Sequence, residues 1–245
     1  MSFQAVYEPT GKAREYCELA LNIYDGCPNG CYYCYAPKVR HMQKEEFHNH
    51  CQPYKNICER AKYDAESGLL TGKTVQLCFT CDPYPSGVDT TPTREIIQNF
   101  KDCGVHVQIL TKNPSCAARD FDLLDGKDFF GVTLTAFSKT VSFCAEPKAD
   151  MPIERLSALK SAKQLGISTW VSFEPVIKAG DTLALLDAVI EDKSANFIKI
   201  GKMNYFNPQS PVNWADFGRR AEAKCKAAGQ PYYIKESLRA EMEKA

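Results

Sequence analysis

The chain has 245 residues, of which 44% are hydrophobic and 24% charged, and its 30 basic and 30 acidic residues give a formal net charge of zero. This length and composition suffice for one large domain, and the start of the chain has no apolar segment typical of a signal peptide or a membrane span. Zero net charge excludes an overall electrostatic attraction to nucleic acid, so any such site would be local. Twelve cysteines without a secretory leader indicate a reducing compartment, and we expect a cytoplasmic protein with no membrane partner.

Short apolar runs alternate along the chain with helical patterns, which predicts parallel strands joined by helices. The runs predict six strands, at Leu19–Tyr24, Thr74–Phe79, Val105–Thr111, Phe129–Thr135, Ser168–Phe173 and Asn196–Ile200. Helices are expected at Asn56–Glu66, Thr93–Cys103, Ala117–Leu124, Ile153–Leu165, Thr182–Glu191 and Val212–Ala228, with further helix up to residue 245. The pattern predicts an α/β fold, a partial (βα)6 TIM-like barrel in one domain spanning residues 1–245.

In a barrel of parallel strands, the loops at the carboxyl ends of the strands build the active site. We therefore expect one mouth formed by Cys27–Tyr35, Thr80–Pro85, Lys112–Asn113, Thr133–Thr135, Glu174–Pro175 and Lys202–Tyr205. The longest irregular stretch, Ala36–Tyr54, is predicted as a lid or substrate loop beside that mouth.

Three cysteines stand within eight residues near the start of the chain, in a loop at residues 25–36. Cys27, Cys31 and Cys34 follow a CxxxCxxC spacing, with glycines at 26 and 30 and tyrosines on both sides of the last cysteine. Three thiolates can hold three irons of a 4Fe-4S cluster, and with no fourth ligand nearby one iron stays open to another molecule. We expect S-adenosylmethionine at that open iron.

A zinc knuckle, or a set of buried free thiols, is the alternative to a cluster. Zinc usually takes four ligands in two spaced pairs, and the second pair here would be Cys78 and Cys81, which leaves one of the three clustered cysteines unused. The spacing therefore favours the cluster. His48, His50, Cys51 and Cys58 form a further collection of ligand types, for which a polar surface is favoured over an auxiliary metal site.

The triplet, with Tyr33 before its third cysteine, resembles the signature of the radical SAM superfamily. Segments along most of the chain are similar to the spore photoproduct lyase family: Asn22–Cys27, Asp82–Pro85, Leu110–Pro114, Arg119–Leu124, Gly131–Thr135, Trp170–Val176 and Phe197–Lys202. The resemblance implies an enzyme whose reduced cluster cleaves S-adenosylmethionine to a 5'-deoxyadenosyl radical, with the protein supplying orientation and exclusion of side reactions.

The resemblance also implies residues that bind the cofactor. Tyr33 occupies the aromatic position that touches adenine, and Lys112 matches a lysine that contacts the methionyl carboxylate, where a charge-assisted bond is strong. Thr133 or Thr135 would add hydroxyl hydrogen bonds beside it. Glu174, at a strand end before a proline, is expected to bond a ribose hydroxyl or a substrate amine, with a purely structural role as the alternative.

In the lyase family a cysteine returns a hydrogen atom to the product radical, helped by tyrosines near the cluster. This chain offers Cys78, Cys81 and Tyr35 for that step, although alignment of Thr80 and Asp82 with the family pattern puts Phe79 at the donor position. Cys81 is the better reactive candidate because it lies in a loop, whereas Cys78 is equally well explained as a core residue. The pair is also suited to bind a metal or to form a redox disulfide.

The sequence thus predicts a spore photoproduct lyase-like radical SAM enzyme that abstracts hydrogen from a nucleobase, nucleotide or nucleic acid, fed by an external one-electron donor of the flavodoxin or ferredoxin type. Local basic residues at Lys38, Arg40, His41 and Lys44 support a nucleic-acid substrate. Compared with the lyase, we expect this chain to lack the N-terminal extension and much of the C-terminal region that carries DNA-lesion contacts, which argues against thymine-dimer repair. Two alternatives remain open, a radical SAM enzyme acting on a small metabolite or peptide, and a non-catalytic iron–sulfur or zinc protein that binds nucleic acid or transfers electrons.

Overall fold

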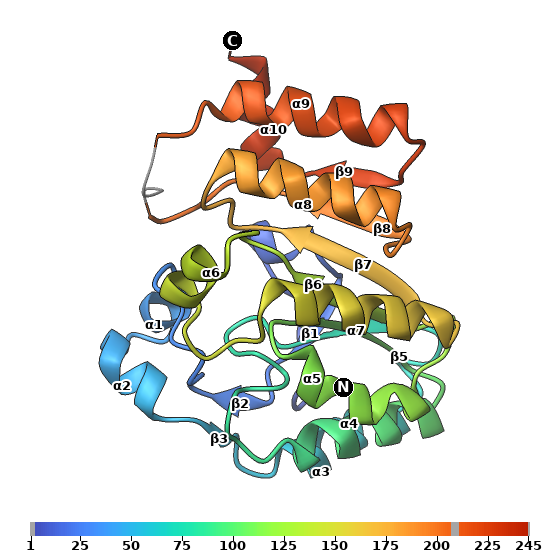
Figure 1. Ribbon diagram of the computed structural model, residues 1–245. Helices are drawn as coiled ribbons and strands as arrows, with labels where there is room; N and C mark the ends of the chain where they lie inside the picture. The colour runs from blue at the N-terminus through green and yellow to red at the C-terminus, as the bar shows by residue number, and fades with distance from the viewer. Residues whose placement is uncertain (1–2, 207–210, 245) are drawn as a thin grey trace.

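Seven parallel strands form one curved sheet in the computed structural model, which describes residues 3–206 and 211–244 (Figure 1). The order across the sheet is β1-β4-β5-β6-β7-β8-β9, so each strand lies beside the next strand of the sheet along the chain. The strands are β1 Leu19–Leu21, β4 Thr74–Leu77, β5 His106–Thr111, β6 Phe129–Thr133, β7 Ser168–Phe173, β8 Phe197–Ile200 and β9 Tyr232–Ile234. The predicted partial barrel is confirmed, with β9 as a seventh strand that the sequence did not reveal.

Helices follow the strands and cover one face of the sheet. In Figure 1 the long helices α3, α4, α7, α8 and α9 lie along the sheet, while α1, α2 and α6 gather at the end toward which the β7 arrow points. The α-helices of the described residues are α1 Ala36–Val39, α2 Lys44–Asn49, α3 Ile57–Glu66, α4 Thr91–Asp102, α5 Pro114–Ala117, α6 Lys139–Ala145, α7 Pro152–Gln164, α8 Ala179–Glu191, α9 Trp214–Ala227 and α10 Glu236–Glu243. The helix predicted at Ala117–Leu124 is instead the end of α5 followed by a 3-10 helix, Ala118–Leu123.

The segment Ala36–Tyr54 was expected to be irregular and is instead ordered, while its role as a lid or substrate loop stays a prediction. It contains α1, α2 and a short strand, β3 Gln52–Pro53, which pairs antiparallel with β2 Tyr24–Asp25. Phe47 of α2 is fully buried and packs with Cys27 and Ala36. The segment therefore supports the cysteine loop.

The core lies between the sheet and its helices. Apolar residues such as Val75, Ile109 and Val171 point from the strands into this layer and are fully buried. A parallel sheet has to be covered on both faces, and the opposite face carries larger polar and aromatic side chains. There Gln76 and Gln108 are hydrogen-bonded at 2.8 Å. Within the described residues, no helix combines the length and the apolar character that crossing a membrane requires.

The N-terminal segment crosses the polar face from one edge of the sheet to the other. Tyr7 exchanges backbone hydrogen bonds of 2.8 Å with Ala20 of β1. Further on, the Glu15 carboxylate accepts a 3.1 Å bond from the hydroxyl of Tyr233 in β9, and the backbone oxygen of Tyr16 accepts a 2.9 Å bond from Nζ of Lys199 in β8. The segment therefore links the two edges that the half-barrel leaves apart.

Candidate active site

One cavity of about 470 Å³ opens at the carboxyl ends of the strands and collects residues from loops far apart in the sequence. The N-terminal segment, α1, the last residue of β6 and the loops after β4, β5, β7 and β8 all contribute to its wall. The predicted site residues that line it are Cys27, Cys31, Tyr33, Cys34, Tyr35, Cys78, Cys81, Lys112, Thr133 and Glu174. The loops expected to form one mouth do so.

The cysteine loop is held in place by contacts with α2 and with the turn that leads to β3. Gly26 has a φ of +85°, and a Cβ there would lie 1.6 Å from the backbone oxygen of His50, so only glycine fits. The backbone N–H of Cys27 donates to the oxygen of Phe47 at 3.2 Å, and Nδ1 of His48 lies 2.7 Å from the oxygen of Cys27. Contacts with residues about twenty positions later in the chain therefore set the backbone course of the cysteine loop.

Cys27 and Cys31 are buried, and Cys34 is partly exposed. Burial raises the pKa of Cys27 well above the ordinary thiol value, raises that of Cys31 to about 12 and also raises that of Cys34. Among the described residues no three His, Cys, Asp or Glu side chains already converge to hold a metal ion. The donor set nevertheless fits an iron–sulfur cluster, because three soft sulfur ligands face one cavity, and binding would draw them together and displace their protons.

A buried carboxylate, Asp82, joins the cysteine loop to the end of β5. Its oxygens accept bonds from the Thr111 hydroxyl at 2.6 Å, the Lys112 backbone N–H at 2.9 Å, the Tyr84 backbone N–H at 2.9 Å and the Asn29 amide at 3.2 Å. Asn29 lies between the first two cysteines of the triplet. Burial raises the pKa of Asp82 in spite of Lys112 and these donors. Asp82 thus holds the cysteine loop in position against the end of β5.

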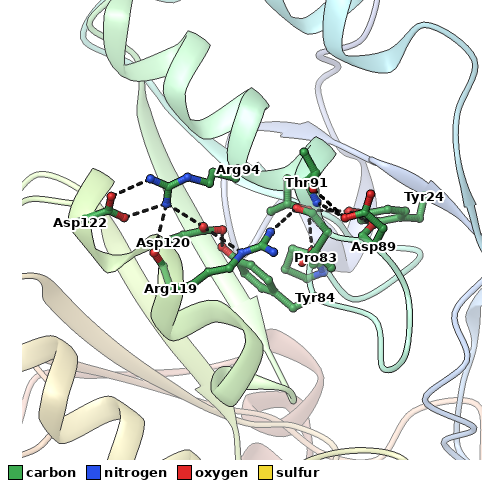
Figure 2. Close-up of polar contacts among 11 residues, drawn as sticks. Tyr24, Pro83, Tyr84, Asp89, Thr91, Arg94, Arg119, Asp120 and Asp122 are labelled. Atoms are coloured by element: carbon green, nitrogen blue, oxygen red, sulfur yellow. Dashed lines mark hydrogen bonds and ion pairs between the residues drawn. The ribbon is translucent and has the colours of Figure 1, made fainter.

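A charged network stands behind the loop that carries Asp82 (Figure 2). The Asp120 carboxylate accepts bonds from the Tyr84 hydroxyl and from Arg94, both at 3.0 Å, and from Arg119 at 3.2 Å. Arg94 also makes bonds of 2.8 and 2.6 Å to the two oxygens of Asp122. Figure 2 shows these side chains joining α4, the 3-10 helix and the Pro83–Tyr84 loop, which fixes the loop that enters the cavity.

Tyr33 is held by a second buried carboxylate. Its hydroxyl donates to Glu146 Oε1, and Glu146 Oε2 pairs with Arg155 at 2.6 Å, with both charged side chains fully buried. Burial alone would raise the pKa of Glu146, but the positive charges of Arg155 and Lys112 hold it below its usual value. The tyrosine ring is therefore fixed beside the cysteines, at the position expected to touch adenine.

Lys112 presents a cation to the cavity. Its Nζ lies 5.9 Å from the centroid of the Tyr33 ring, and among the described residues no carboxylate forms an ion pair with it. Burial would lower its pKa, but Cys31, Glu146 and Asp82 nearby raise it, so the ammonium stays charged. Such a group favours a carboxylate ligand.

Glu174 already has three partners in the cavity wall. Oε2 accepts bonds of 2.6 Å from both the Tyr16 hydroxyl and Lys235 Nζ, and Oε1 accepts a 2.8 Å bond from the amide of Asn204. A carboxylate has about four acceptor positions, so room remains for one ligand hydroxyl. The structural alternative is therefore supported, and it does not exclude a ligand contact.

The loop after β4 presents two thiols to the cavity. Cys78 has a φ of +64°, a strained backbone conformation for a residue with a side chain, which costs about 1–3 kcal/mol. The Asn22 side chain maintains the turn by accepting the N–H groups of Phe79 and Thr80 at 2.8 and 3.0 Å. Tyr35 donates its hydroxyl to the oxygen of Phe79 at 2.6 Å, so all three residues proposed for hydrogen return lie together.

Two threonines differ in position. Thr133 lines the cavity, whereas Thr135 does not, and the buried hydroxyl of Thr135 has no hydrogen-bond partner in the described residues.

The possible metal ligands His48, His50, Cys51 and Cys58 do not converge on one point in the described structure. The Cys51 thiol points to the oxygen of Gly26 at 3.4 Å, and the Cys58 thiol points to that of Pro92 at 3.9 Å.

Aromatic and basic side chains form the rim of the cavity. The rings of Tyr35 and Tyr205 lie 6.1 Å apart between centroids, and Lys12 Nζ lies 5.1 Å from the Tyr205 ring. Nearby, Lys38 Nζ lies 5.3 Å from the ring of Phe206. Tyr205 is 63% exposed, so the ring is available to a ligand at the entrance.

The sequence did not point to several of these residues. Glu146 and Arg155 belong to unremarkable helical segments, and Tyr16 and Lys235 are more than two hundred residues apart, so no local signal marks either pair. Asn29 had a weak signal, because it lies in the turn between two of the cysteines.

No family model matches the chain. An uncharacterised protein of Acidianus two-tailed virus, ORF301, is 27% identical over 169 residues, which cover 64% of this chain and 55% of that protein. An uncharacterised protein of Methanocaldococcus jannaschii, MJ0683, is 29% identical over 162 residues, which cover 64% of this chain and 60% of that protein. The chain therefore spans little more than half the length of these relatives.

Solved structures match over most of the chain. A spore photoproduct lyase complexed with dinucleoside spore photoproduct has a TM-score of 0.68 at 13% identity, covering 93% of this chain and 79% of that one. A mutant of the lyase with bound AdoMet and the dinucleoside has a TM-score of 0.69 at 12% identity, covering 92% and 78%. Streptococcus suis SuiB bound to S-adenosylmethionine has a TM-score of 0.65 at 12% identity, covering 88% and 50%.

These likenesses establish the fold. The curved parallel sheet with its terminal cavity is the half-barrel that is also found in spore photoproduct lyase and SuiB. The similarity to spore photoproduct lyase confirms the fold resemblance inferred from the sequence.

Proposed function

We propose that this protein is a radical SAM enzyme in which Cys27, Cys31 and Cys34 hold a 4Fe-4S cluster and S-adenosylmethionine binds in the adjoining cavity. The observation that carries the proposal is the meeting in one cavity of these cysteines and the ammonium of Lys112, which pairs with no carboxylate in the part of the chain that the structure describes. When bound, the cluster and S-adenosylmethionine would supply a 5'-deoxyadenosyl radical that abstracts hydrogen from a substrate.

The protein's own residues orient the cofactor in this proposal. Lys112 binds the methionyl carboxylate, since its ammonium lines the cavity near the Tyr33 ring and has no ion-pair partner in the described residues. Tyr33, fixed by Glu146, offers its ring to adenine. The hydroxyl of Thr133 and the remaining acceptor position of Glu174 take hydroxyl or amino groups of the ligand. Thr135, whose buried hydroxyl lies outside the cavity lining, is proposed to support the position of Thr133.

For the substrate, we propose a nucleobase, nucleotide or nucleic acid. The rim supports this class, because Tyr35 and Tyr205 offer rings on which a base can stack and Lys12 offers a charge for phosphate. The lyase of similar fold was solved with a dinucleoside photoproduct, which also supports it. An external one-electron donor of the flavodoxin or ferredoxin type would reduce the cluster.

The test is anaerobic reconstitution with iron and sulfide, reduction, and chromatographic detection of 5'-deoxyadenosine from added S-adenosylmethionine. Wild type and Cys58→Ala should both produce it, because Cys58 points away from the cavity to Pro92. Cys31→Ala should lose cluster iron and product together. Lys112→Met should keep its iron and bind S-adenosylmethionine more weakly. A well-loaded wild type that yields no 5'-deoxyadenosine would contradict the proposal and favour a non-catalytic metalloprotein.

A further inference from the structure

A short surface loop near the start of the chain, residues 8–14, is anchored to the rest of the protein at both ends. Before the loop, the buried carboxylate of Asp64 accepts the backbone N–H groups of residues 4–6 at 2.7, 2.7 and 2.8 Å. After the loop, the hydroxyl of Tyr16 donates to the carboxylate of Glu174 at 2.6 Å. The two ends of the loop are therefore fixed, and any motion is confined to the residues between them.

Few bonds hold the loop itself. Its backbone hydrogen bonds in the described structure are local, such as that from the Arg14 N–H to the oxygen of Gly11 at 3.0 Å. From outside the loop, Nζ of Lys235 donates to the oxygen of Lys12 at 3.4 Å. Gly11 has a φ of +57°, and a Cβ there would meet no atom within 4 Å, so the backbone has open space around it. A segment with so few bonds opens more easily than its anchors.

The loop stands at the entrance of the cavity. The residues that both line the cavity and are exposed to solvent mark this entrance, and they are Thr10, Lys12, Tyr35, Val39 and Tyr205. Thr10 and Lys12 belong to the N-terminal loop, whereas Tyr205 belongs to the loop after β8. The two loops therefore meet at the entrance.

Lys12 joins the two loops. Its ammonium donates to Oδ1 of Asn204 at 2.5 Å and lies 5.1 Å from the centroid of the Tyr205 ring. The amide N–H₂ of Asn204 donates to Glu174 at 2.8 Å, which leaves the amide oxygen to face Lys12. In the part of the chain that the structure describes, no carboxylate pairs with Lys12. Because an anion is a stronger acceptor than a neutral amide, an anionic group that enters the cavity would take the ammonium from Asn204.

We propose that residues 8–14 form a hinged flap over the cavity, with Lys12 as its latch, and that Lys12 also selects a ligand that carries an anionic group such as a phosphate. Without a ligand, the ammonium holds the flap to Asn204 and Tyr205. With an anionic ligand, the ammonium binds the anion and the flap stays over the entrance. The flap does not rest on the proposed function. Selection of a phosphate does, because that function names a nucleotide among its substrates.

The flap is tested by the rate at which N-ethylmaleimide reaches thiols inside the cavity of the folded, full chain. Cys78 and Cys81 line the cavity, and both lie in the tryptic peptide 74–94, which contains no other cysteine. Cys116 is exposed, lies outside the cavity lining and is the only cysteine of the tryptic peptide 113–119. Mass spectrometry after short labelling times, quenching and digestion gives the rates for the cavity thiols and for this reference thiol.

Two variants release the latch in different ways. Lys12→Met removes the ammonium, and Asn204→Ala removes its acceptor. We expect each variant to label the cavity thiols several-fold faster than wild type, with the reference thiol unchanged. Lys55→Met is the matched control and should label like wild type, because Lys55 is exposed and does not line the cavity. Equal rates at the cavity thiols of wild type and Lys12→Met would overturn the flap.

Selection of an anion is tested in the same assay with thymidine 5'-monophosphate and thymidine, which differ only in the phosphate. We expect the monophosphate to slow labelling of the wild-type cavity thiols several-fold more than thymidine does, and the two to act alike on Lys12→Met. Equal protection of wild type by both compounds, or protection by neither, would overturn the selection and leave the flap to the rates of the variants. Formation of 5'-deoxyadenosine from S-adenosylmethionine tests the proposed function separately.

Discussion

Asp82 is the single side chain on which the shape of the site depends most, because its buried carboxylate accepts four hydrogen bonds from three loops. Asp82→Asn would place an amide N–H₂ against groups that are themselves donors. We expect the substitution to lower the free energy of unfolding by about 1–3 kcal/mol, the usual effect of an unsatisfied buried donor, measured by urea denaturation. Asp89→Asn is the matched control, because Asp89 is exposed and its side chain bonds only to Thr91 in its own turn. Equal losses in the two variants would contradict this role.

Glu146 and Arg155 form a fully buried ion pair, and loss of one member leaves the other charge unpaired. We expect Glu146→Gln to lower the free energy of unfolding at neutral pH by about 3–5 kcal/mol, with release of the Tyr33 hydroxyl as a further effect. The double variant Glu146→Gln with Arg155→Met should recover part of this loss, because it removes the unpaired charge. A double variant less stable than the single one would argue against the ion pair as the cause.

The same carboxylate gives a pH dependence of known sign. The pKa of Glu146 is lower in the folded protein than in the unfolded chain, so its contribution to stability is fully present above the unfolded value of about 4.3. That contribution is lost as the pH falls through the lower, folded value. The difference in unfolding free energy between wild type and Glu146→Gln should therefore be constant near neutral pH and shrink in acid. A difference that grows in acid would show that the pKa is raised instead.

Among the elements, the α1–α2–β3 segment supports the cysteine loop, and Gly26 is the point of contact. Gly26→Ala would place a Cβ against the His50 carbonyl, whereas Gly68→Ala meets no atom within 4 Å at a comparable φ of +75°. We expect the control to lose about 1 kcal/mol of stability from backbone strain alone, and Gly26→Ala to lose clearly more and to retain less iron after reconstitution. Thermal unfolding and iron analysis measure both effects, and equal behaviour of the two variants would exclude the contact.

The accuracy with which the sequence predicts an element depends on the length of that element's pattern. Runs such as Ser168–Phe173 are long and rich in β-branched and aromatic residues, and this strand was predicted to the residue. β9 has only three residues, and the turns of α1 and α2 are too short to show a helical period, so these elements were missed. In the site, local motifs indicated the cysteines and Lys112, which do line the cavity, while their roles stay predictions. Tertiary contacts bring Glu146, Arg155 and Lys235 to the site, and the spacing of residues in the sequence does not reveal such contacts.

At the scale of the whole molecule, the N-terminal segment joins the two edges of the half-barrel through Glu15. Glu15→Ala removes bonds to the Tyr233 hydroxyl and to the Glu236 N–H, while Glu18→Ala changes an exposed neighbour. We expect Glu15→Ala to speed hydrogen exchange of the amides of Arg14 and Tyr16, which bond within the segment, with little effect in the control. Mass spectrometry of peptides from this region measures the rates, and unchanged exchange would show that other contacts fix the segment.

The bonds that shape the cysteine loop reach far along the chain, from Asn29 to Asp82 and from Tyr33 to Glu146. During synthesis on the ribosome, the three cysteines emerge long before these partners exist. The loop therefore reaches its final form only after residue 155, the ion-pair partner of Glu146, has been made. Under the proposed function, a cluster on these cysteines would be inserted after that stage, and the three thiols of the nascent chain would stay free until then.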